Sequence, residues 1–187
     1  MNVALRNPVM SLEEFLAWEK RQDERWEFDG YEPQAMVGGT SAHNKIVGAL
    51  EFALRQRLKS PCHVYHENMR LRLAHTMRYP DLMVVCTPVP NEATEITDPT
   101  VVIEVLSTST FRTDRIAKNR EYEAAPSIRR YILLEQDAIA AEVYVREGDR
   151  WVRSTVTGDG ILAMPEINVE IPLADAYSGL ELGTQTI

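Results

Sequence analysis

The chain has 187 residues, of which 44% are hydrophobic and 26% charged, and its net charge is −8. This length and composition predict one globular domain, spanning residues 1–187, with room for a full core. The acidic balance argues against a protein that coats nucleic acid by bulk electrostatics.

Targeting signals and metal-type cysteine spacings are both missing from the sequence. No apolar run is long enough to cross a membrane, and the first ten residues lack the basic and apolar segments of a secretory signal. We therefore expect a cytoplasmic protein without membrane contact. Cys62 and Cys86 match neither a metal motif nor a disulfide framework, which predicts two reduced thiols.

The first elements are predicted from capping and turn signals. Ser-Leu-Glu-Glu at residues 11–14 matches a capping box and predicts a helix over about residues 11–22. An Asp-Gly pair at 29–30 lies between two strand-like runs, which favours a hairpin with a tight primed turn. A second helix is expected from Ser41 to just before Pro61, because apolar residues recur there at helical spacing.

Two apolar runs dominate the middle of the chain. Residues 79–85 and 101–106 are short and rich in β-branched side chains, which predicts neighbouring strands in a sheet covered on both faces. Each run carries one carboxylate, Asp81 in the first and Glu104 in the second. Two carboxylates in buried strands repel each other and are costly to bury unless a cation lies between them.

The remaining segments complete a mixed α/β order with helices on both sides of a central sheet. Residues 89–99 are predicted to be a loop, and a helix is expected from residue 113 or 114 to 125, where Pro126 ends it. Alternation near the C-terminus predicts a meander. The predicted strands outside the central pair cover residues 64–67, 69–73, 130–134, 141–146, 150–156 and 161–164.

Asp81, Glu104 and Lys118 together suit one chemistry. Mg²⁺ takes oxygen ligands and is commonly held by one or two carboxylates with water and substrate phosphates. A lysine beside it can orient the attacking water or steady the pentavalent oxyanion, which suffices for phosphodiester hydrolysis. The alternative is that Pro80–Asp81 is a turn and Glu104 a paired core carboxylate; on spacing alone this is the commoner origin of such a pattern.

At these residues the chain resembles a known nuclease group. The order Pro80–Asp81, apolar strand, Glu104–Val105 is similar to the PD-(D/E)XK signature of restriction-endonuclease-like nucleases, and the wider pattern resembles its Uma-type family. Each motif is weak alone, but their order and spacing over about residues 11–146 are specific. The stretches that carry the resemblance are Trp26–Glu27–Phe28–Asp29–Gly30, Ser41–Ala42–His43–Asn44, Pro80–Asp81, Glu104–Val105–Leu106–Ser107, Asp114–Arg115 with Lys118 and Tyr122, and Arg129–Arg130–Tyr131–Ile132–Leu133.

The resemblance implies a fold and a metal site. The implied fold is a restriction-endonuclease-like central mixed β-sheet flanked by helices, here with an additional N-terminal hairpin and a C-terminal meander. Asp81 and Glu104 would bind Mg²⁺, with Mn²⁺ able to substitute, and the backbone carbonyl of Val105 is a candidate third ligand. The superfamily places its lysine two residues after the second acid, where this chain has Leu106. In this branch the lysine is relocated to the following helix, which makes Lys118 the candidate.

Further candidates surround this set. Glu27 resembles an additional early glutamate that would bind a second metal or order a water; the alternative is an exposed hairpin residue. His43, Arg112 and Arg115 are candidate phosphate contacts, the arginines because they lie near a predicted helix start. The alternative for His43 is a surface or capping role. Tyr122 lies one helical turn from Lys118 and either packs over the lysine stem or is an ordinary core tyrosine.

The resulting functional hypothesis is a Mg²⁺-dependent endonuclease that acts on nucleic acid, with DNA as the expected substrate. We expect a homodimer, because cutting both strands of duplex DNA needs two active sites. Two basic blocks, +5 over residues 43–78 and +3 over 112–130, flank the central strands; solvated faces would also account for them. The main alternative is a non-catalytic nucleic-acid-binding or interaction module that retains the fold, motivated by the acidic charge and by Leu106. A third is a purely structural role for the acids.

Overall fold

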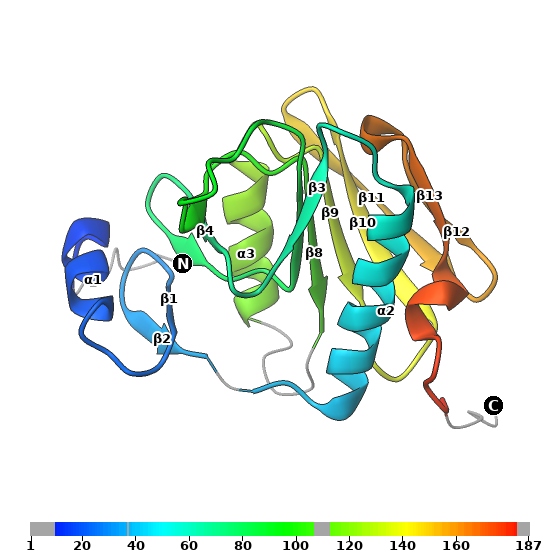
Figure 1. Ribbon diagram of the computed structural model, residues 1–187, viewed down its shortest axis with the longest axis horizontal. Coiled ribbons are helices and arrows are strands. Elements are labelled where there is room, and N and C mark those ends of the chain that lie inside the picture. Colours follow the sequence, from blue (N-terminus) through cyan, green and yellow to red (C-terminus); the bar gives the residue numbers. More distant parts are fainter. Residues whose placement is uncertain (1–9, 37, 107–112, 183–187) are drawn as a thin grey trace, which may run out of the picture.

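The computed structural model describes residues 10–36, 38–106 and 113–182, with residues 113–115 described by their backbone only. Its centre is a six-stranded sheet in the order β11-β10-β9-β8-β6-β3 (Figure 1). Strands β8 and β9 run parallel and all other neighbours antiparallel, so the sheet is mixed. Its strands are β3 (His63–His66), β6 (Leu82–Val85), β8 (Val101–Val105), β9 (Arg130–Leu134), β10 (Ala140–Glu147) and β11 (Arg150–Thr157).

The two acidic strands are neighbours, as predicted, because β6 pairs antiparallel with β8. Helix α2 (Ser41–Arg57) covers one face of the sheet and α3 (Thr113–Glu123) covers the other (Figure 1). Since successive strand residues point to opposite faces, the apolar side chains of β6 and β8 pack into two hydrophobic cores, one on each face of the sheet. Val84 and Ile103 lie in the core under α2, whereas Met83 and Val102 lie in the core that Tyr122 of α3 completes.

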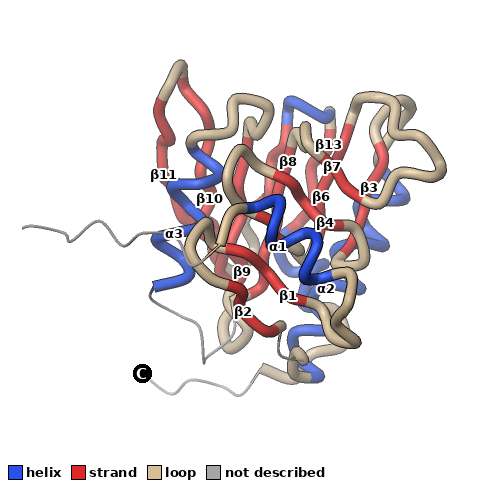
Figure 2. The backbone as a smooth tube through the Cα atoms, turned by 90° about the vertical axis from the view of Figure 1, so that its left-hand side faces the viewer, coloured by secondary structure: helices blue, strands red, loops and turns tan. Residues whose placement is uncertain are grey.

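A smaller N-terminal unit adjoins this sheet. Helix α1 (Leu12–Glu19) lies beside β1 (Trp26–Phe28) at the left of Figure 1, on the side of the molecule away from α2. This side faces the viewer in Figure 2, where α1 and β1 lie in front. The predicted capping box is present at Ser11 and Glu14. Phe15 stacks on Phe28 within a small separate core. The second sheet has the order β2-β1-β5-β4-β7, with β2 (Pro33–Ala35), β4 (Arg70–Arg72), β5 (Met77–Arg78) and β7 (Glu95–Ile96).

Two predictions about connections are wrong. The hairpin turn has four residues, 29–32, because Phe28 pairs with Pro33. The Asp29 carboxylate accepts the backbone N–H groups of Tyr31 and Glu32 at 2.8 and 2.9 Å, which stabilises this longer turn. The predicted loop 89–99 contains β7, a two-residue strand whose parallel partner β4 lies far away in the sequence.

The C-terminal region follows the predicted meander only in part. Strands β9, β10 and β11 form it, but β12 (Ile161–Met164) leaves the sheet and pairs with β13 (Val169–Pro172) in a two-stranded ribbon. Short 3₁₀ helices at Pro165–Ile167 and Leu173–Tyr177 follow these strands. The ribbon adds its buried side chains to the α2 core, which explains the alternation without membership in the central sheet.

The prediction of two reduced thiols is also wrong, because Cys62 and Cys86 form a disulfide. The physical reason is strand register. His63 at the start of β3 pairs with Val85 at the end of β6, so the two cysteines meet one position further on, with their Cα atoms 3.9 Å apart. Separately, within the ranges the structure describes, no helix combines the length and apolarity that a bilayer crossing requires.

Candidate active site

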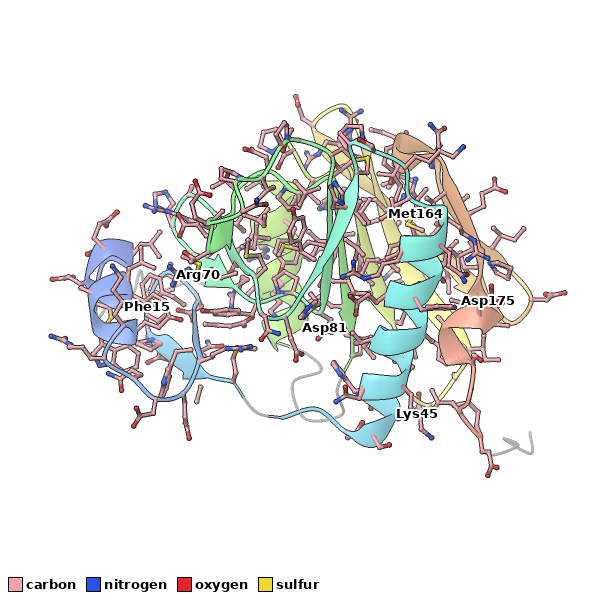
Figure 3. The ribbon with its side chains drawn as sticks, in the orientation of Figure 1. Phe15, Lys45, Arg70, Asp81, Met164 and Asp175 are labelled. Atoms are coloured by element: carbon pink, nitrogen blue, oxygen red, sulfur yellow. A yellow bond between two sulfur atoms is a disulfide. The ribbon has the colours of Figure 1, made fainter. Side chains whose placement is uncertain are left out.

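The two candidate metal ligands lie at one end of the β6–β8 pair. Leu82 pairs with Ile103, so the next position along the register sets Asp81 beside Glu104. Figure 3 shows Asp81 at the lower end of the central sheet, in the region between α2 and α3. Asp81 is 9% exposed and therefore needs partners for its charge.

Asp81 finds those partners on two elements. Its Oδ2 accepts the backbone N–H of Val105 at 2.7 Å, and the Nε2 of His43 lies 3.2 Å from both carboxylate oxygens. His43 belongs to the first turn of α2, where its own N–H is capped by the Thr40 hydroxyl. The hydrogen bond that His43 donates to the Asp81 carboxylate raises the pKa of His43 despite partial burial, and the charges of Asp81, Glu67 and Glu104 add to the rise.

Lys118 reaches Glu104 from the helix on the other face of the sheet. Its Nζ lies 3.2 and 3.3 Å from the two oxygens of Glu104 and 3.4 Å from Oε1 of Glu27, and the side chain is 8% exposed. Tyr122, one turn further along α3, is fully buried and donates its hydroxyl to Oε1 of Glu104 at 2.9 Å. Burial and the charge of Glu104 raise the pKa of Tyr122 well above its usual range, so it is a neutral donor.

Glu27 is buried in β1, so the alternative of an exposed hairpin residue is wrong. Its Oε1 accepts the backbone N–H of Tyr79 at 3.0 Å, and its Oε2 accepts from Arg78 at 3.2 Å. Burial raises the pKa of Glu27, but Lys118, Arg78 and the Tyr79 N–H together outweigh it and lower the pKa below its usual value. Glu27 is therefore a carboxylate at neutral pH.

Sequence reasoning missed Arg78 and Glu121. The guanidinium of Arg78 is fully buried and binds both oxygens of Glu121 on α3, through Nε at 2.8 Å and a terminal nitrogen at 2.6 Å. Two signals were available in the sequence. Arg78 is a lone base immediately before the Tyr79–Val85 run, and Glu121 follows Lys118 by three positions, on the same side of a helix.

The described ionisable side chains of this cluster are mostly acidic. The carboxylates of Glu27, Glu104 and Glu121 contact Arg78 or Lys118, and the carboxylate of Asp81 contacts His43. Among the described side chains of this cluster, the carboxylates outnumber Arg78 and Lys118 by two. Buried negative charge is stable when it is paired or coordinates a metal.

The donor set fits a hard cation that keeps part of its water shell. Among residues 10–36, 38–106 and 113–182, no group of three or more His, Cys, Asp or Glu side chains is placed to hold a metal ion by itself. Asp81 and Glu104 supply two carboxylates, which is the usual protein share for Mg²⁺ when substrate phosphate and water complete the shell. The side chains of Arg112 and Arg115 lie outside the described part of the chain.

Comparison with known proteins identifies the family. A family model described as "Uma2: Putative restriction endonuclease" matches residues 12–174. The chain belongs to the Uma2 family. Among the proteins similar to this chain, the uncharacterized protein slr1290 of Synechocystis sp. (strain ATCC 27184 / PCC 6803 / Kazusa) is 30% identical over 178 residues, which cover 92% of this chain and 94% of that protein. The uncharacterized protein sll1609 of the same strain is 28% identical over 166 residues, covering 85% and 94%.

A solved structure supports the same assignment of the fold. A crystal structure described as "a putative nuclease belonging to DUF820 from Anabaena variabilis ATCC 29413" superposes with a TM-score of 0.70, covering 90% of this chain and 98% of that chain. The sequence identity is 17%, so the likeness shows the fold alone. It confirms the predicted nuclease-like α/β architecture.

Proposed function

We propose that this Uma2 protein is a metal-dependent endonuclease that hydrolyses phosphodiester bonds in nucleic acid, with DNA as substrate. The observation that carries the proposal is the position of Lys118, whose ammonium group contacts Glu104 on the strand that pairs with the Asp81 strand. In this arrangement a helix provides the lysine that Leu106 does not provide at the usual strand position. Because duplex cleavage needs a site for each strand, we further propose a homodimer.

Asp81 and Glu104 would hold Mg²⁺, or Mn²⁺ in its place. When bound, the ion lowers the pKa of a coordinated water and stabilises the charge that grows on the phosphoryl group. Val105 is a candidate third donor. The N–H and C=O groups of one strand residue point to the same side, and the Val105 N–H points at Asp81, so its carbonyl would face the same ion.

The remaining side chains would orient the reacting groups. The Nζ of Lys118 would hydrogen-bond the attacking water or a non-bridging phosphoryl oxygen. Glu27 and Glu104 hold the lysine in place, since both carboxylates lie within 3.4 Å of its nitrogen. His43 contacts both oxygens of Asp81 and would fix the orientation of that carboxylate toward the ion.

The proposal is tested by nuclease assays in the presence of Mg²⁺, Mn²⁺ or EDTA. The substrates are supercoiled plasmid, labelled duplex oligonucleotides and labelled single-stranded oligonucleotides. We expect metal-stimulated cleavage by the wild type and none above background by Asp81→Ala, which should also lose Mn²⁺ binding by calorimetry. Lys45→Ala is the matched control, because Lys45 is exposed and, within the part of the chain that the structure describes, donates only to the carbonyl of Gly179. Cleavage by Asp81→Ala at the wild-type rate would remove the proposal.

A second candidate is a nucleic-acid-binding module that keeps the fold without catalysis. It is favoured by Asp81, whose two oxygens are already engaged by His43 and the Val105 N–H. The same assay separates the two functions. DNA binding by gel shift without cleavage under any divalent metal would support the second candidate.

A further inference from the structure

Arg78 is an unusual residue for its position. It is 0% exposed, yet it carries a permanent charge, and burying a guanidinium is costly unless its hydrogen bonds are satisfied. It lies at the end of the two-residue strand β5, three positions before Asp81. One guanidinium thus binds carboxylates from two other elements, Glu121 of α3 and Glu27 of β1.

The contact with Glu121 fixes α3. A bidentate arginine–carboxylate pair holds both partners in one plane and one register, which a single point charge does not do. Glu121 lies three positions after Lys118 and directly before Tyr122. The Arg78–Glu121 pair therefore holds the turn of α3 from which Lys118 and Tyr122 donate hydrogen bonds to Glu104. A shift of α3 along its axis would move Lys118 and Tyr122 together.

The contact with Glu27 fixes the other partner of the lysine. Arg78 binds Oε2 of Glu27, which leaves Oε1 to the Tyr79 N–H and to Lys118. Both oxygens of Glu27 therefore have protein donors. This arrangement makes Glu27 one of the carboxylates that hold Lys118, and Arg78 and the Tyr79 N–H fix that carboxylate in turn.

We infer that Arg78 is a positioning residue, which clamps Glu121 and Glu27 and thereby sets where the Lys118 ammonium lies relative to Glu104 and Asp81. A lysine on a strand is placed by the hydrogen-bond ladder of its sheet, whereas a lysine on a helix is placed only by how the helix is docked. The Arg78 clamp supplies that docking. The inference rests on the proposed nuclease function, so its test includes a measurement that needs no activity.

The activity-independent measurement is the chemical reactivity of Lys118. The chain has four lysines, and Lys20, Lys45 and Lys59 are exposed while Lys118 is 8% exposed. Limited acetylation followed by peptide mass spectrometry reports each lysine separately. In metal-free wild type, Lys118 should be acetylated least. Glu121→Gln, and independently Arg78→Lys, should raise its rate at least fivefold relative to Lys45.

The kinetic measurement separates positioning from binding. In Glu121→Gln and Arg78→Lys we expect kcat to fall by ~10- to 100-fold, as misplacement of a catalytic group does. KM and Mn²⁺ affinity should stay within about twofold, because Asp81 and Glu104 are untouched.

Glu166→Gln is the matched control. Glu166 accepts a bidentate pair from the buried Arg130, at 2.6 and 3.0 Å, and Arg130 pairs with Val101 at the end of β8 away from Glu104. Glu166→Gln weakens a buried bidentate arginine–carboxylate pair like that of Arg78 and Glu121, but away from the candidate site. It should therefore leave kcat and the acetylation rate of Lys118 unchanged.

Two results would overturn the inference. One is wild-type acetylation of Lys118 and wild-type kcat in both clamp variants, and the other is an equal loss in Glu166→Gln, which would mark a general effect of destabilisation. A wild-type protein that does not cleave would remove the proposed nuclease function, while the acetylation rates would still decide whether Arg78 positions Lys118.

Discussion

Replacing Lys118 by methionine tests the site through the free energy of unfolding. The change removes the ammonium that lies 3.2 to 3.4 Å from Glu104 and Glu27 and leaves both carboxylates buried. Removing one partner of a buried ion pair costs about 3–5 kcal/mol. We expect the lower end, ~3 kcal/mol, because Glu104 keeps Tyr122 and Glu27 keeps Arg78 and the Tyr79 N–H. For a chain of this size, that loss lowers Tm by roughly 6–12 °C.

The assay is thermal unfolding of metal-free protein in EDTA, repeated with Mn²⁺. Lys118→Met removes a cation that repels the metal, so the Mn²⁺-induced rise in Tm should be larger in this variant than in the wild type. Cleavage should nevertheless fall by ~10²- to 10⁴-fold, the usual share of a general acid–base or orienting group. Lys45→Met should change the free energy of unfolding by less than ~0.5 kcal/mol. A wild-type Tm for metal-free Lys118→Met would refute the reasoning.

Three further predictions concern the metal, the histidine and the disulfide. Asp81→Asn should abolish the Mn²⁺-induced rise in Tm and the calorimetric binding signal; an undiminished signal would exclude Asp81 as a ligand. Because Asp81 raises the pKa of His43, the pair stabilises the fold fully below the usual pKa of about 6.5, and the contribution is lost as pH rises through the raised folded value. The difference in free energy of unfolding between wild type and His43→Gln, measured by urea unfolding in EDTA, should therefore be larger at acid than at alkaline pH. A difference that increases with pH would contradict this. Reduction of the Cys62–Cys86 disulfide, which closes a loop with a sequence separation of 24, should lower the free energy of unfolding by roughly 3 kcal/mol. The Tm of a Cys62→Ser/Cys86→Ser variant should not change with reductant. Equal Tm values for the oxidised and reduced wild type would count against the prediction.

Local patterns predicted most of the elements. The capping box at Ser11, the helical apolar stripe before Pro61 and the two β-branched runs each correspond to an observed element. These signals succeed because capping and side-chain periodicity act over a few residues. Pairing partners were harder, since β12 alternates like a meander strand but pairs with β13, and the two residues of β7 are too few for any periodicity.

The sequence pointed to part of the candidate cluster, whereas Arg78, Glu121 and most of the contacts did not stand out. Asp81, Glu104 and Lys118 carry a recognisable order, but the burial of Glu27 and its bond to Arg78 depend on how the second sheet docks against the first. The disulfide is similar in kind. Nothing in the spacing of Cys62 and Cys86 indicates that β3 and β6 share a register, and that register alone brings the sulfurs together.

The small core built from Leu12, Phe15, Phe28 and Met77 has a practical consequence for anyone who trims this protein. The first forty residues lie outside the central sheet, so a truncated variant designed around that sheet would omit them. Such a deletion would remove Glu27 and expose the guanidinium of Arg78 to solvent. An inactive truncated protein would then report the loss of that support for the lysine, and it would say nothing about whether the full-length chain cuts DNA.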